Sequence, residues 1–239
     1  MNNINFKALS LMMAGAALMT ASADAAIVNV DITAAPGTGP TGFNLPGVIG
    51  DQSAPQWNPV TDQSLYSGLI DEDGVATGFS FQLNAPEIDG FSNGGANNHF
   101  FKSYAWLASG DDSQQQGAFT IGGLDNSKIY NLYFYATWEW INAGSEFSVD
   151  GGATWKLSDG VPSESNAAFT EGSSYVKFEG VAPTAGEIDG LWRSTVAGDS
   201  TVHRGMFNGV QIEEVVPEPG SLALLGLGGL LIGARRRRG

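Results

Sequence analysis

Cysteine is absent from this chain of 239 residues, and histidine occurs only twice, as His99 and His203. The absence of cysteine excludes disulfide bonds and a cysteine nucleophile, so stability must come from the core and from any bound metal. Basic residues are also scarce, with 11 lysines and arginines against 25 aspartates and glutamates. Because such an acidic chain repels nucleic acid and anionic membrane surfaces, we expect no nucleic-acid partner.

Long apolar runs are confined to the two ends of the chain. Near the N-terminus, Lys7 precedes an apolar run over residues 8–19, and Ala23-Asp24-Ala25 then forms a small-x-small cleavage pattern. We therefore predict a signal peptide over residues 1–25, cut by signal peptidase after Ala25. This cut leaves Ala26 as the new N-terminus, and cleavage after Ala23 is the alternative.

Residues 216–239 combine three unlike features in a fixed order. The extended motif Pro217-Glu218-Pro219 comes first, an apolar run over residues 221–234 follows, and four arginines, Arg235, Arg236, Arg237 and Arg238, stand before the last residue. As a helix, the 14 residues of the run reach about 21 Å. A bilayer core is about 30 Å thick, so we predict a short transmembrane helix that holds the chain transiently.

This order of motif, short apolar helix and basic end closely resembles the PEP-CTERM sorting tail of Gram-negative bacteria. The resemblance implies that an exosortase processes the chain. It also implies an exported precursor that the tail holds in the inner membrane, with its arginines on the cytoplasmic side, before the protein reaches the cell surface or the extracellular space. It says nothing about the function of the intervening body.

The body, residues 26–215, is long enough for one domain and carries six basic and 23 acidic residues, a net charge of −17. Its apolar residues alternate at period two between glycine-rich loops, which predicts an antiparallel, jelly-roll-like β-sandwich. We expect a short helix only at residues 100–107 and an irregular stretch at 34–66. The strands are expected at 28–32, 75–83, 118–124, 129–140, 146–149, 154–157, 174–181 and 206–215.

Four segments of the body are similar to jelly-roll modules that are common in PEP-CTERM proteins and beside some carbohydrate-active enzymes. They are IYNLYFYATW, EFSVDGG, SSYVKFEGV and FNGVQIEE. By analogy alone, this resemblance implies binding of a sugar or polysaccharide, because a fold does not determine a function.

Tryptophans are the candidate sugar-binding residues. Trp138 and Trp140 would project from one face of their strand, and indole rings stack on the apolar faces of pyranose sugars. The competing interpretation places tryptophans of a central strand in the core. Trp57, Trp106 and Trp192 stand near expected loops and are further candidates, of which we select Trp192.

Asp71 and Asp73 are the candidate metal ligands. They lie in the loop Asp71-Glu72-Asp73-Gly74, and carboxylates at alternating positions of a tight loop can bind calcium. The competing interpretation is an acidic hairpin turn that leads into the strand after it. Calcium is therefore the one candidate cofactor, and no other is expected.

Catalytic signals are weak. The block Gly198-Asp199-Ser200 matches the nucleophile block of one lipase and esterase superfamily, but it lies late in a β-rich chain and His203 follows only three residues later. We interpret it as a solvated loop, assign no catalytic residue and expect no enzyme.

The leading hypothesis is an exported surface or extracellular-matrix protein that is processed through its tail. Its body would associate with extracellular polysaccharide without catalysis. The alternatives are a glycan-active hydrolase or esterase, and a structural matrix protein bridged by calcium.

Overall fold

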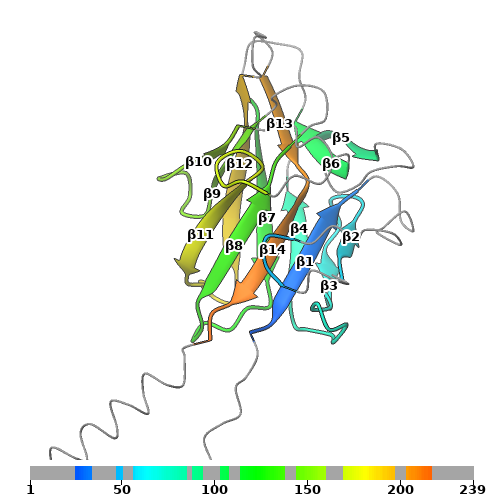
Figure 1. The fold of residues 1–239 in the computed structure, drawn as a ribbon, viewed down its shortest axis with the longest axis vertical. Helices are drawn as coiled ribbons and strands as arrows, with labels where there is room; N and C mark the ends of the chain where they lie inside the picture. Colours follow the sequence, from blue (N-terminus) through cyan, green and yellow to red (C-terminus); the bar gives the residue numbers. More distant parts are fainter. Residues whose placement is uncertain are drawn as a thin grey trace, which may run out of the picture. The chain divides into compact units, whose positions relative to one another are not determined.

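The computed structural model describes residues 25–33, 47–50, 56–84, 88–93, 103–107, 114–137, 144–159, 169–196 and 203–216. These residues form β-strands, turns and loops without a helix, and Ala26–Val215 forms one compact unit (Figure 1). The all-β sandwich expected from the alternation is thus confirmed. The expected signal helix and the helix of the tail lie outside the described residues. Within the described ranges, no helix is long and apolar enough to cross a bilayer.

The smaller sheet has five strands in the order β11-β8-β14-β1-β2. Its pairs are antiparallel except β1 with β2, which run parallel. Its strands are β1 (Ile27–Ile32), β2 (Asn58–Val60), β8 (Tyr130–Tyr135), β11 (Tyr175–Val181) and β14 (Gly209–Glu214).

The larger sheet has nine strands. Seven of them follow the order β3-β4-β7-β12-β13-β6-β5, while β9 pairs with both β12 and β10. Its strands are β3 (Tyr66–Ser67), β4 (Ser80–Asn84), β5 (Ile88–Asn93), β6 (Ser103–Leu107), β7 (Gln116–Gly122), β9 (Ser145–Ser148), β10 (Lys156–Ser158), β12 (Ile188–Val196) and β13 (His203–Phe207).

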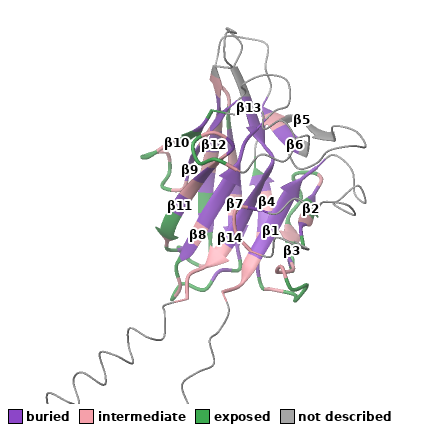
Figure 2. Cartoon of the chain, in the orientation of Figure 1, coloured by how far each residue is buried: buried purple, intermediate pink, exposed green. Residues whose placement is uncertain are grey.

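The core is a cluster of aromatic rings contributed by both sheets. Phe134 of β8 lies 4.9 Å from Phe119 of β7 and 5.1 Å from Phe147 of β9, measured between ring centroids. Phe207 contacts this group and also Trp192, whose centroid is 5.5 Å away. Stacked and edge-to-face rings bury much apolar surface, so this cluster holds the sheets together in a chain without disulfides. Figure 2 shows how much of β1, β8 and β14 is buried.

Two expectations about secondary structure are wrong. Residues 103–107 form strand β6 where a helix was expected, because Ala105 and Leu107 join the main core while Tyr104 packs on the opposite side with Met206. Strand β12, which was not expected, pairs with β7, β9 and β13. Its glycine is required by packing, since a Cβ at Gly190 would lie 2.0 Å from the Phe119 ring.

Other strand boundaries differ locally. The stretch expected at 206–215 divides at Asn208, whose side-chain oxygen accepts a hydrogen bond from the Thr137 amide at 2.7 Å. The strand expected at 75–83 begins only at Ser80, and residues 58–60 and 66–67 form short strands inside the stretch expected to be irregular. The partner strands in each sheet determine where these strands begin and end, and the local sequence pattern does not reveal the partners.

The first and last residues of the body lie on adjacent antiparallel strands. Ile27 pairs with Glu213, and the Glu214 amide donates to the Ala26 carbonyl at 3.0 Å. Ala26, the residue expected to follow the signal cut, is thus hydrogen-bonded at the start of the sheet.

Candidate functional site

The outer face of the larger sheet is polar and open to solvent. Its side chains alternate with core residues such as Phe81, Phe119 and Trp192, which point the other way. On β4, β7 and β12 the outward polar residues, all exposed or half-buried, are Ser80, Gln82, Asn84, Gln116, Thr120, Asp189, Arg193 and Thr195. We call this surface the open face.

Hydrogen bonds connect three strands across the open face. The Asn84 amide donates to the Thr120 hydroxyl at 3.3 Å, and that hydroxyl donates to the Asp189 carboxylate at 2.8 Å. Thr120 pairs with Asp189 of β12 on one side and with Gln82 of β4 on the other, and Asn84 lies two residues from Gln82 along β4. The result is a row of polar groups that can form hydrogen bonds with a ligand lying across the strands.

An aromatic ring is held at one side of the open face. The Arg193 guanidinium lies 4.0 Å from the centroid of the half-buried Trp155 ring, and its Nε donates to the Glu146 carboxylate at 2.6 Å. Gly152 lies beside this ring and beside Leu191, at distances where a Cβ would be in ordinary contact with both. The indole is therefore held against the Arg193 cation and lies beside the Gly152 backbone.

The hairpin between β9 and β10 places Trp155. Its turn, Asp150-Gly151-Gly152, lies between the strands expected at 146–149 and 154–157, and both glycines have positive φ, 71° and 89°. Asp150 accepts hydrogen bonds from the Ser148 hydroxyl at 2.7 Å and the Thr154 amide at 2.9 Å. The bond from the Thr154 amide is the main cause that lowers the pKa of Asp150 to about 2. The sequence thus builds a rigid turn immediately before Trp155.

The outer face of the smaller sheet is polar but covered. Gln211, fully buried, accepts from the Val48 amide at 2.8 Å and from the Tyr135 hydroxyl, and its amide donates to Asn29 at 2.7 Å and to the Ile49 carbonyl at 3.1 Å. Residues 47–50 lie over this face through these bonds. We call it the covered face.

The tryptophans selected from the sequence do not form the site. Trp192 is fully buried in the aromatic core, because its position on β12 points inward, so its selection as a sugar platform is corrected. Trp57 is also buried. Trp138 and Trp140 lie outside the described residues. Trp155 was missed, although its position three residues after Gly152 could have indicated a ring close to a turn.

The acidic loop of Asp71 and Asp73 is a tight turn. The Asp71 side chain accepts from the Asp73 amide at 3.1 Å and the Val75 amide at 2.8 Å, and Gly74 has a φ of 77°. This geometry corresponds to the competing hairpin-turn interpretation. No group of three or more His, Cys, Asp or Glu side chains suited to a metal occurs among the residues with described placement. The block Gly198-Asp199-Ser200 lies outside them.

The model of the PEP-CTERM protein-sorting motif matches residues 215–238. The match includes Pro217, Glu218, Pro219 and the four arginines, which lie outside the described residues. The chain therefore carries a PEP-CTERM sorting signal, which implies an exported, surface-directed protein that is processed by an exosortase. No curated protein matches the chain.

Proposed function

We propose that this exported protein is a non-catalytic module that associates with extracellular polysaccharide through the open face of its larger sheet. The observation that carries the proposal is the Trp155 ring, held by Arg193 on the same outer face of β12 as Asp189, which belongs to the row of polar side chains. Sugars present apolar ring faces and hydroxyl edges, so an indole and neighbouring amide and carboxylate groups match both. The similarity of body segments to jelly-roll modules beside carbohydrate-active enzymes supports the same class of ligand.

The charge of the body restricts the ligand further. With a net charge of −17 over residues 26–215, the domain repels polyanions. Arg193 does not offset the negative charge around Trp155, because its Nε is already paired with the Glu146 carboxylate. We therefore propose a neutral polysaccharide as the ligand.

Binding to a glycan array tests the proposal. Trp155→Ala should weaken the strongest neutral-glycan signal about tenfold, the effect of losing one stacking ring. Leu65→Ala is the control, because it truncates an apolar side chain that is 60% exposed and belongs to the loop before β3. Equal binding by both variants would contradict the site, and turnover of a bound glycan would contradict the non-catalytic role.

We also propose that the precursor is held in the inner membrane before processing. The apolar run and the arginine block of residues 221–238 support this stage, because a short span needs a charged end to hold it. Replacing Arg235–Arg238 with serine should release unprocessed precursor outward, whereas Pro217→Ala with Glu218→Ala should trap uncut precursor in the membrane fraction. Unchanged fractionation in both variants would contradict the proposal.

A further inference from the structure

Two apolar side chains lie side by side within the otherwise polar open face. Leu191 of β12 and Ala118 of β7 are direct cross-strand partners, and both are half-buried. They point outward, because their chain neighbours Trp192 and Phe119 belong to the core on the other side of the sheet. The core therefore does not account for this apolar pair, which belongs to the surface.

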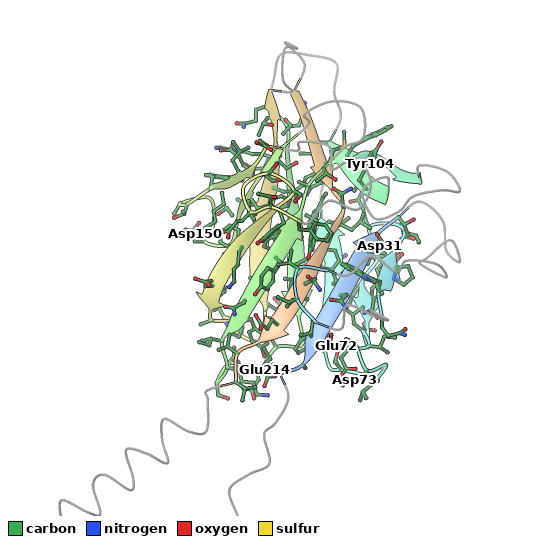
Figure 3. All side chains as sticks on the ribbon, in the orientation of Figure 1. Asp31, Glu72, Asp73, Tyr104, Asp150 and Glu214 are labelled. Atoms are coloured by element: carbon green, nitrogen blue, oxygen red, sulfur yellow. The ribbon has the colours of Figure 1, made fainter. Side chains whose placement is uncertain are left out.

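The Trp155 ring extends the pair toward β9. Ser148, the partner of Leu191 on β9, accepts a hydrogen bond from the Gly152 amide at 2.9 Å, so the turn that begins at Asp150 lies over this position (Figure 3). A Cβ at Gly152 would lie 3.4 Å from the Trp155 ring and 3.5 Å from a methyl group of Leu191. The ring and the pair thus continue one another across the strands. We call them together the apolar strip.

Polar side chains border the apolar strip on both sides. Two residues away along the strands, Arg193 pairs with Gln116 on one side of the strip, and Asp189 pairs with Thr120 on the other. A β-strand rises about 3.3 Å per residue, so these two polar rows stand about 13 Å apart. The open face therefore offers an apolar floor with hydrogen-bonding groups along both edges.

A sugar ring lying flat on this floor fits it best when all of its hydroxyls are equatorial. Equatorial hydroxyls project sideways from the ring and can reach the polar rows, while the C–H groups of the ring face meet the apolar strip. An axial hydroxyl projects from the ring face and would be buried against the apolar strip without a hydrogen-bond partner. Burial of an unpaired hydroxyl is costly, so the floor selects against it.

We propose that the open face selects polysaccharide chains of β-linked pyranoses whose hydroxyls are all equatorial, as in glucose, over chains with an axial hydroxyl, as in mannose. This inference rests on the proposed function, because it concerns the ligand of the same face. An equatorial linkage keeps successive rings in one ribbon, which can follow the apolar strip across β9, β12 and β7. Ala118 is the position that determines specificity, since its side chain is the small, apolar part of the floor farthest from Trp155.

Isothermal titration calorimetry of the purified full chain in nonionic detergent tests this selection. The probes are soluble oligomers of equal length built from β-linked glucose or β-linked mannose, which differ in one hydroxyl per ring. Glucose oligomers should bind about tenfold more tightly, because none of their hydroxyls is buried unpaired. Ala118→Ser adds a hydroxyl that can pair with an axial one, so it should lower this preference about threefold. Ala182→Ser, the same change at an exposed position after β11, is the control and should keep the preference.

The outcomes separate this inference from the proposed function. If Trp155→Ala weakens binding but the parent chain binds both oligomers equally well, the face binds sugar without selecting equatorial hydroxyls, and only the inference fails. An unchanged preference in Ala118→Ser, or an equal fall in Ala182→Ser, would show that the apolar strip does not set the specificity. If neither oligomer binds in a way that depends on Trp155, the inference also fails, and the glycan array decides separately on the proposed function.

Discussion

The two outer faces of the sandwich carry similar residue types in opposite environments. On the covered face, Asn29, Asp31 and Gln211 are at most 1% exposed, and Asn29 and Gln211 are hydrogen-bonded to each other, to Gln56 and to residues 47–50. On the open face, the comparable Asn84 and Asp189 are exposed. Polar side chains therefore stabilise the first face and are available to a ligand on the second. The same alternating pattern has two physical outcomes, depending on what covers the sheet.

The largest expected difference between the faces is in stability. Gln211→Ala should lower the free energy of unfolding by about 3 kcal/mol, because it removes the buried hydrogen bonds that join this side chain to Val48, Tyr135, Asn29 and Ile49. Gln82→Ala removes the same side chain from the open face and should change it by less than about 0.5 kcal/mol. Urea unfolding measures both. Similar losses of unfolding free energy in the two variants would mean that Gln211 is no better shielded from solvent than Gln82.

A smaller effect on stability is expected at the side of the open face where Arg193 contacts both Trp155 and Glu146. Arg193→Ala removes the stack on Trp155 and the pairing with Glu146, and should cost about 1 kcal/mol of unfolding free energy. Glu146→Gln keeps the stack and a hydrogen-bond acceptor, so it should cost less. Both variants are compared by urea unfolding, with Trp155 fluorescence reporting the ring environment. A larger loss for Glu146→Gln would mean that the ion pair, and not the stack, orders this region.

The smallest expected effect concerns the turn that positions Trp155. Asp150 has a pKa of about 2 in the folded state, lower than in an unfolded chain, so its contribution to stability is present above pH 4. It should be lost as the pH falls from about 4 through 2, and Asp150→Asn should remove this pH dependence. NMR titration of the Asp150 carboxyl carbon checks the value. A midpoint near 3.9 would show that the turn does not hold the carboxylate in solution.

Several elements were predictable because their causes are local. The Asp150-Gly151-Gly152 turn needs positive φ at two adjacent residues, and the glycines that permit it are visible in the sequence. Alternation over residues 28–32 and 175–181 likewise reports strands directly. In contrast, β12 was missed because Gly190 interrupts its apolar pattern, and only the Phe119 ring on the paired strand explains that glycine.

The sequence by itself determined the sorting signal and the all-β class, since a motif order, an apolar run and a period-two pattern are properties of the chain alone. Only the tertiary structure decided which tryptophan is core and which lies at the surface, as Trp192 and Trp155 show. It also decided that Gln211 is buried against residues 47–50 while Asp71 caps its own turn. The physical reason is that alternation places a side chain on one side of a strand, but long-range pairing and loop cover determine what that side meets.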